Sequence, residues 1–161
     1  SSTATFTLVC DADTLLLRKR KWVDGGSSVL TPSFESNHQY YLFLNRAFNM
    51  SVNPEFSYVS HHMLINNKKM GEIFRLNRLG SIHDLILNIC ENADFNAASM
   101  VSVDYEFYAQ SMQEHFPNEI HLEKWSNIGL PARYFKLFNK SSLVRKILTL
   151  NFQSVSFHSW S

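Results

Sequence analysis

Two hydrophobic periodicities occur along this chain, and together they require strands and helices in one fold. A period of two marks residues 4–10 and 100–108, where apolar and polar side chains alternate as on a half-buried strand. A period of 3.6 marks the segment after Ser81, whose one apolar face contains Ile82, Leu85, Ile86, Ile89 and Cys90. No internal repeat or linker interrupts residues 1–161, so we expect a single domain. The pattern predicts an α+β fold, with a twisted, mostly antiparallel sheet packed against two to four helices in two layers.

The remaining segments fit the same architecture. Two hairpins are expected where short apolar runs flank a polar or glycine-containing turn. One comprises residues 15–23 and 27–31 around Asp24-Gly25-Gly26, and the other comprises residues 56–65 and 72–79 around 66–71. Two further strands are expected over residues 39–48 and 152–160. Helices are expected where apolar residues recur every three or four positions, over residues 119–128, 132–138 and 142–150, in addition to the one that Ser81 and Asp84 cap.

Composition limits the class of protein. Hydrophobic residues make up 45% of the 161 and charged residues 18%, which excludes intrinsic disorder. No apolar run has the length of a membrane span. Cys10 and Cys90 lie in apolar segments, and we expect both to be buried free thiols. Free thiols favour a reducing compartment, so the expected location is intracellular, either cytoplasmic or nuclear, with peripheral membrane association as an open alternative.

Charge is segregated along the chain, although the net charge is only +1. Residues 79–123 contain eight acids and no base, and residues 124–161 contain six bases and no acid. These stretches either fold against each other or form separate faces that join one molecule to the next. A heterologous contact of the second kind builds rings, filaments or sheets. The residues expected to take part in self-association are Asp104, Glu106, Glu114, Glu119, Glu123, Trp125, Tyr134 and Phe135.

Basic residues with aromatic neighbours suggest a second surface, for another macromolecule. A run of four bases precedes Trp22, two lysines occupy an expected hairpin tip, and five bases follow residue 132 among aromatic residues. Such groups suit phosphate neutralisation and stacking, or contact with an anionic membrane surface. The residues concerned are Arg18, Lys19, Arg20, Lys21, Lys68, Lys69, Arg133, Lys136, Lys140, Arg145 and Lys146.

No catalytic or cofactor motif is present in the sequence. It contains no nucleophile elbow, no phosphate-binding glycine loop, no CxxC and no HExxH. Adjacent His61 and His62 would point to opposite faces of a strand. Asp104 and Glu106 would share a solvated strand face about 7 Å apart. We therefore expect no enzyme, metal, cofactor or small-molecule substrate; an unrecognised enzyme would need a cavity that holds His115, His121 or Asp104.

These observations favour a non-enzymatic assembly or scaffold protein with a matrix-like role. It would associate with itself as an oligomer or lattice, and it would contact a protein partner, nucleic acid, nucleoprotein or anionic membrane through its basic and aromatic patches. The alternative is a nucleic-acid-binding domain that uses residues 18–21 and the C-terminal basic face. These two hypotheses differ in whether large, salt-sensitive species form without nucleic acid.

Overall fold

The computed structural model describes residues 4–35, 37–52, 55, 57–94, 101 and 103–159. Within this part of the chain it confirms the α+β class, with six α-helices and eight strands. The strands are β1 (Phe6–Cys10), β2 (Thr14–Leu16), β3 (Val23–Asp24), β4 (Ser27–Leu30), β5 (His62–Asn66), β6 (Ile120–Leu122), β7 (Asn127–Pro131) and β8 (Ser154–His158). The helices are α1 (His38–Phe48), α2 (Asn67–Leu76), α3 (Ile82–Asn92), α4 (Tyr105–His115), α5 (Phe135–Lys140) and α6 (Ser142–Asn151), with short 3₁₀ turns η1 (Pro117–Glu119) and η2 (Ala132–Tyr134).

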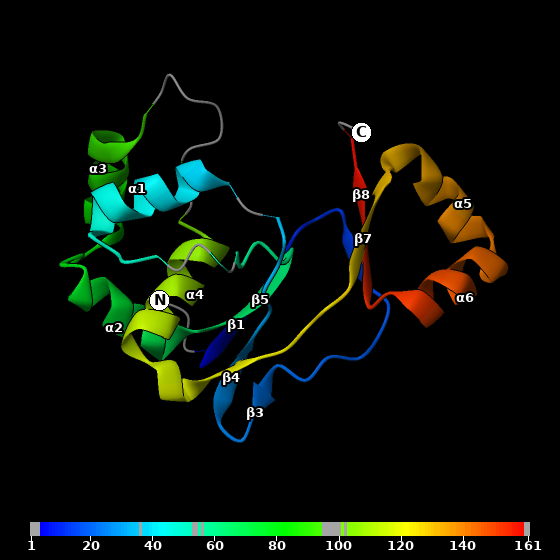
Figure 1. Ribbon diagram of the computed structural model, residues 1–161, viewed down its shortest axis with the longest axis horizontal. Coiled ribbons are helices and arrows are strands. Elements are labelled where there is room, and N and C mark those ends of the chain that lie inside the picture. The colour runs from blue at the N-terminus through cyan, green and yellow to red at the C-terminus, as the bar shows by residue number, and fades with distance from the viewer. Residues whose placement is uncertain are drawn as a thin grey trace.

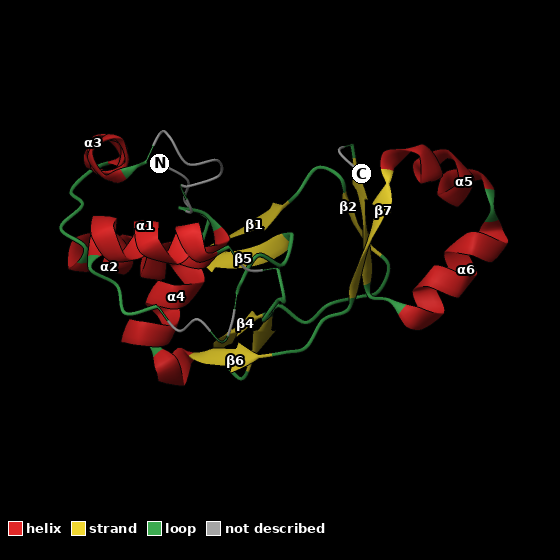
Figure 2. Ribbon diagram, turned by 45° about the horizontal axis from the view of Figure 1, so that its top comes forward, coloured by secondary structure: helices red, strands yellow, loops and turns green. Residues whose placement is uncertain are grey.

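The elements form two lobes of unequal size (Figure 1). Helices α1–α4 gather around β1 and β5 in the larger lobe, with β3, β4 and β6 below them, and β2, β7, β8, α5 and α6 form the smaller lobe (Figure 2). The strands make three small sheets in place of the expected continuous one, in the orders β1-β5, β3-β4-β6 and β2-β8-β7. Pairs β4-β6 and β7-β8 are parallel, and the other three are antiparallel.

Each lobe has its own hydrophobic cluster. The larger cluster surrounds α4, in which every residue from Tyr105 to Met112 is buried. The smaller cluster consists of Phe138, Val155 and Phe157, with partly buried neighbours that include Ile128 and Leu148. The smaller cluster therefore holds few buried side chains, and β8, at the centre of its sheet, pairs with both β2 and β7.

Several local predictions are confirmed. The Ser81 hydroxyl accepts a hydrogen bond from the Asp84 amide at the start of α3. Gly25 and Gly26 have φ angles of 57° and 91°, which the tight β3–β4 turn requires and glycine adopts without strain. Helices α5 and α6 and strands β1 and β8 lie within or beside their expected segments.

Three expected strands are helices. Residues 39–48 lie in α1, which Asn37 caps, and residues 72–76 lie in α2, which Asn66 caps. Residues 105–108 begin α4, although the alternation predicted a half-solvated strand; Met100 and Ser102 of that segment lie outside the described residues. Helix α4 is buried on all sides from Tyr105 to Met112, so it shows no apolar stripe and its periodicity cannot be distinguished from that of a strand.

Two further predictions are wrong. Residues 119–128 form η1 and strands β6 and β7 where a helix was expected, because β6 pairs with β4 and β7 with β8, neither of them adjacent in sequence. Cys10 and Cys90 are free thiols but are exposed, because neither the Cys10 side of β1 nor the Cys90 side of α3 is covered. None of the helices among the described residues has the length and hydrophobicity of a membrane-spanning segment.

Candidate functional site

The segment from η2 to α6 carries a basic helical face, which we define as Arg133 on η2, Lys136 and Lys140 on α5, and Arg145 and Lys146 on α6. All five side chains are exposed, as the sequence predicted for the C-terminal segment. Apolar side chains lie among them: Leu143, Ile147 and Leu150 on α6 are 64%, 50% and 68% exposed. Their spacing of four and three residues places them on one stripe of the helix. Because Leu148 packs inward, α6 is apolar on its solvent side as well as on its core side.

Helix α3 presents a similar stripe with the opposite charge. Ile82 and Ile86 are 64% and 50% exposed, one turn apart, while Leu85 packs into the larger core. Asp84 and Glu91 lie on the same helix. Helix α3 and the α5–α6 pair lie at opposite ends of the molecule (Figure 1). Asp84 and Glu91 line the groove beside α3 together with Arg46 from α1 and Arg78 from the loop after α2, so this groove carries both signs of charge.

The lobes differ in net charge. The smaller lobe, taken as residues 12–19 and 124–159, contains eight bases and one acid, a net charge of +7. The rest of the chain contains the other seven bases and 13 acids, a net charge of −6. Among the predicted self-association residues, Asp104, Glu114 and Glu119 are exposed on the larger lobe, and Tyr134 and Phe135 are exposed on the smaller one.

Glu106 does not belong to any surface. Its side chain is fully buried in α4, where the carboxylate accepts hydrogen bonds from Ser57 Oγ at 2.6 Å, the Tyr58 amide at 2.7 Å and Gln110 Nε2 at 3.1 Å. Burial raises its pKa above the ordinary value. The expected Asp104–Glu106 pair on a wet strand is therefore wrong, since α4 directs Glu106 into the core. Glu123 and Trp125 are half-buried.

The basic run 18–21 does not form one exposed ribbon. Arg18 donates hydrogen bonds to the carbonyl oxygens of Thr149 and Leu150 at the end of α6. Arg20 lies between the rings of Trp22 and Trp125, 4.8 and 4.6 Å from their centroids, and burial lowers its pKa to about 10. Lys21 pairs with Asp24, and Lys19 is exposed.

Lys69 is also held within the fold. Its ammonium group lies 2.6 Å from Glu119 and 3.3 Å from Glu72, over the ring of Phe116. Lys68 is exposed in the first turn of α2. The two lysines therefore begin a helix, and the predicted hairpin tip does not exist.

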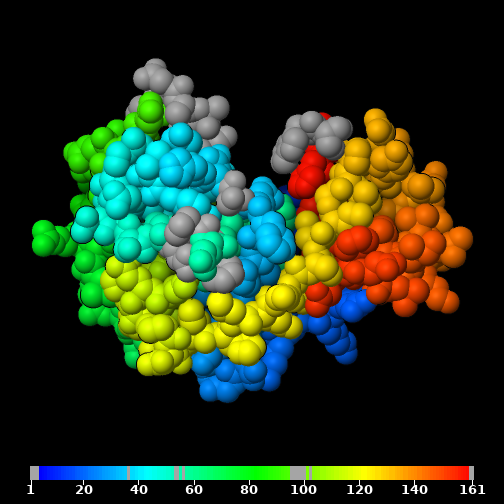
Figure 3. Space-filling model, in the orientation of Figure 1, coloured from blue at the N-terminus to red at the C-terminus, as the bar shows by residue number. Residues whose placement is uncertain are grey.

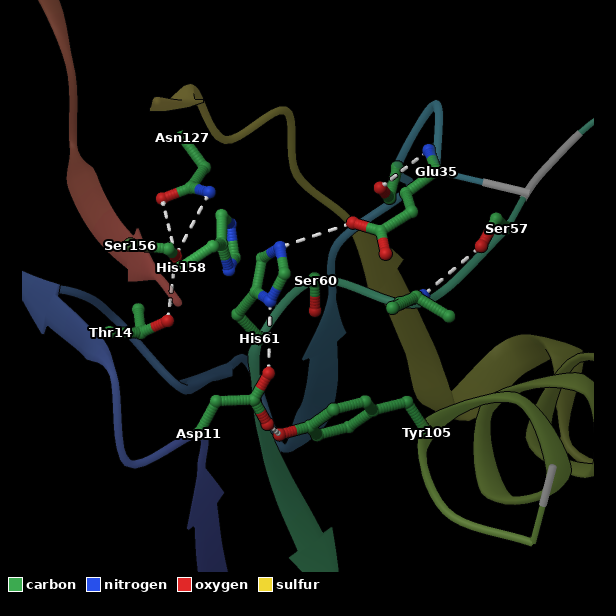
Figure 4. Close-up of polar contacts among 12 residues, drawn as sticks. Asp11, Thr14, Glu35, Ser57, Ser60, His61, Tyr105, Asn127, Ser156 and His158 are labelled. Atoms are coloured by element: carbon green, nitrogen blue, oxygen red, sulfur yellow. Dashed lines mark hydrogen bonds and ion pairs between the residues drawn. The ribbon is translucent and has the colours of Figure 1, made fainter. Parts of the chain in front are cut away.

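The structure brings together a polar cluster at the lobe junction that sequence reasoning missed (Figure 4). His61 has a φ of 62°, a conformation that a bulky side chain rarely adopts. Its Nδ1 lies 2.9 Å from Asp11 Oδ2, and its Nε2 lies 3.3 Å from Glu35 Oε2. The other Asp11 oxygen accepts the hydroxyl of buried Tyr105 at 2.6 Å. Across the junction, the ring of His158 lies 5.8 Å from that of His61.

A cavity of about 690 Å³ opens beside this cluster. It is lined by the loop after β4, the segment before β5, the link between β6 and β7, and Gln153; its side chains include Phe34, Glu35, Glu55, His61, Lys124 and Trp125. His115, His121 and Asp104, the residues named as a condition for an enzyme, do not line it. No local pattern marks His61 in the sequence, because its partners lie about 26 to 50 positions away and meet it only through the tertiary fold. Comparison with known proteins adds no assignment, since the sequence matches no protein-family model and no curated protein.

Proposed function

We propose that this protein assembles head to tail with copies of itself, the α6 end of one molecule binding the α3 end of the next. The observation that carries the proposal is the pair of exposed apolar stripes at opposite ends of the molecule, Leu143, Ile147 and Leu150 on α6 and Ile82 and Ile86 on α3. Neighbouring exposed apolar side chains on a helix mark a surface that a partner covers.

The charges make a second copy the fitting partner. Lys146 lies within one turn of Leu143 and Leu150 on α6, and Asp84 and Glu91 lie on the side of α3 away from Ile82 and Ile86. The net charges of the two lobes, +7 and −6, favour a contact between unlike ends. A contact between unlike ends is heterologous, so it continues into rings or filaments. This favours a scaffold role over that of a closed dimer. It fits an intracellular, matrix-like protein whose remaining basic surface, including Arg133 and Lys136, would contact an anionic partner.

The binding of nucleic acid through residues 18–21 has weaker support. Arg20 is enclosed by two tryptophans, and Arg18 is engaged with α6, which leaves Lys19 as the freely exposed base of the run. An anionic membrane or nucleic acid could instead meet the basic helical face. The experiment below distinguishes binding of a membrane or of nucleic acid from binding of a second copy of the chain.

The decisive experiment uses two matched variants, one for each end. Ile147→Gln/Lys146→Glu alters α6, and Ile86→Gln/Glu91→Lys alters α3; Ile147 and Ile86 are each 50% exposed, so neither double variant empties a core. In light scattering at about 50 mM salt, the wild type should form large species that dissolve at about 500 mM, because the steering charges are then screened. Each variant alone should be monomeric. Mixing the two should give a one-to-one heterodimer that grows no further, since each partner retains one working end.

Lys68→Glu is the control, because it reverses an exposed charge in the first turn of α2, outside α3, α5 and α6. It should assemble as the wild type does. A wild-type protein that stays monomeric at high concentration and low salt would overturn the proposal. The proposal would also be overturned by a protein that forms large species only after RNA or anionic vesicles are added. That outcome would make RNA or a membrane the partner of the basic helical face.

A further inference from the structure

The cavity at the lobe junction plays no part in the proposed assembly. Its volume of about 690 Å³ is typical of small-molecule sites, which often lie between two packed units. A notch separates the two lobes on the face shown in Figure 3. The cavity walls bring together aromatic, acidic and basic side chains from both lobes, and each of these types offers a separate contact to a ligand.

An aromatic platform forms one wall. Trp125 Nε1 donates to Ser154 Oγ at 2.9 Å, and the Arg20 guanidinium lies 4.6 Å from the ring centroid. These contacts fix the orientation of the indole on the cavity wall. Phe34 lies at the rim and is 107% exposed, so its ring has no packing role in the fold. A flat ring bound here would contact one aromatic side chain on the wall and find another at the rim.

A carboxylate is held in place on another wall. The Glu35 side chain is 63% exposed and would be free to rotate, but His61 Nε2 lies 3.3 Å from its Oε2. His61 is fixed in turn by Asp11, and Asp11 by the hydroxyl of Tyr105 in the larger core (Figure 4). A buried tyrosine thus positions a surface carboxylate through two intermediates. Such a carboxylate accepts hydrogen bonds from ligand hydroxyl groups.

One lysine supplies the positive charge. Lys124 lines the cavity, and it lies at the edge of the smaller lobe with its excess of bases. Glu35 and Glu55 also line the cavity, so a ligand with several phosphate charges would meet carboxylates as well as Lys124. The combination suits a ligand with a flat base, a ribose hydroxyl and a single phosphate.

We propose that the lobe-junction cavity binds a ribonucleoside monophosphate unit. The base stacks on Trp125, the ribose 2′-hydroxyl donates a hydrogen bond to Glu35, and the phosphate pairs with Lys124. His61 is a positioning residue, since it acts on the ligand through Glu35. The same unit occurs in free mononucleotides and in single-stranded RNA, and both present the base, hydroxyl and phosphate that the cavity recognises.

The test is calorimetric titration of the monomeric Ile147→Gln/Lys146→Glu protein, so that a failure of self-assembly has no bearing on it. The probes are AMP, dAMP, adenosine, ribose 5-phosphate, ATP and a short oligoadenylate. AMP should bind most tightly of the five small probes, with ribose 5-phosphate weakened by the loss of stacking and ATP by its extra charge. Oligoadenylate binding tighter than AMP would identify RNA as the source of the unit, and equal or weaker binding would identify the free nucleotide.

Variants separate the three contacts. Glu35→Gln should weaken AMP about tenfold and change dAMP little, because the deoxy sugar lacks the hydroxyl concerned. His61→Asn, whose side chain tolerates the left-handed backbone, should reproduce that difference. Trp125→Leu should weaken AMP about tenfold, with partial rescue by phenylalanine. Lys124→Ala should weaken AMP and leave adenosine unchanged, whereas Lys68→Ala should change neither.

The proposal is overturned if neither AMP nor the oligoadenylate binds at millimolar concentration while the protein remains folded by circular dichroism. It is also overturned if ribose 5-phosphate binds as well as AMP, or if Glu35→Gln affects AMP and dAMP equally. Each result removes one of the contacts on which the assignment depends.

Discussion

Glu106 is a carboxylate inside the larger core, and its three donors explain why the fold tolerates it. Ser57 Oγ, the Tyr58 amide and Gln110 Nε2 surround its two oxygens. Glu106→Ala removes the acceptor of all three donors and leaves a cavity in α4, so the free energy of unfolding should fall by about 2–4 kcal/mol. Glu106→Gln keeps one acceptor oxygen and the volume, and it should cost clearly less. Urea denaturation of both variants measures the difference; equal losses would show that the hydrogen bonds contribute little.

His62 makes the stability of the protein depend on pH. It is buried against Trp22 and Trp125, and this burial, together with neighbouring Arg20, lowers its pKa to about 4. The unfolded chain binds a proton near pH 6.5, whereas the folded chain does not until about pH 4. Stability is therefore complete above pH 6.5 and should decline by about 2–3 kcal/mol as the pH falls to 4.

Thermal unfolding across this pH range tests the assignment, with His62→Gln as the comparison. The variant should lose most of the decline, since its side chain does not titrate. Buried Glu106 acts in the opposite direction, because its raised pKa makes the folded state bind the additional proton as the pH falls. Both proteins are therefore best compared in a Glu106→Gln background. Identical pH profiles with and without His62 would contradict the prediction.

At the level of elements, Arg18 connects the segment after β2 to the end of α6. Its guanidinium donates to the carbonyl oxygens of Thr149 and Leu150, which have no partner within the helix. Arg18→Ala should lower the free energy of unfolding by about 0.5–1 kcal/mol, because the site is exposed. Lys19→Ala, at the neighbouring exposed position, is the matched control and should change little. Equal effects in chemical denaturation would show that α6 needs no cap from this side chain.

Local signals predicted some elements well and others poorly, for identifiable reasons. Ser81 predicts the start of α3 because this N-cap residue lies directly before a segment whose apolar residues recur with a helical period. Asn37 and Asn66 cap helices in the same way, but asparagine is equally typical of turns. The segment after Asn37 has apolar residues on nearly every side, whereas Met70, Ile73 and Phe74 in α2 follow a helical period that the predicted hairpin overlooked. In α4, the alternation from Val103 to Phe107 has no structural meaning, since the helix is buried all round.

The candidate sites also differ in whether local sequence patterns could predict them. The basic helical face could be predicted because amphipathic helices place neighbouring residues on one surface. The His61 cluster could not, because Asp11, Glu35 and Tyr105 reach it from separate parts of the chain. Arg20 shows the converse: a run of four bases indicates a surface, yet two tryptophans enclose this member of it.

For the whole molecule, the unequal cores predict that the two lobes differ in local stability. Only Phe138, Val155 and Phe157 are fully buried in the smaller cluster, and no residue of α6 is buried, whereas α4 is buried from Tyr105 to Met112. In monomeric protein, the amides of α5 and α6 should therefore exchange with solvent through local opening, and those of α4 should exchange only near global unfolding.

Hydrogen exchange also tests the link between this weakness and assembly. Head-to-tail contact covers the outer stripe of α6, so the amides of α6 should gain protection as the wild-type concentration rises at low salt, while those of α4 should stay unchanged. The Ile147→Gln/Lys146→Glu variant should show no such gain at any concentration. If α6 is already as protected as α4 in the monomer, the two lobes unfold as one cooperative unit. In that case α6 is already stable in the monomer, and a second copy does not stabilise it further. Charge and apolar contact alone must then drive association.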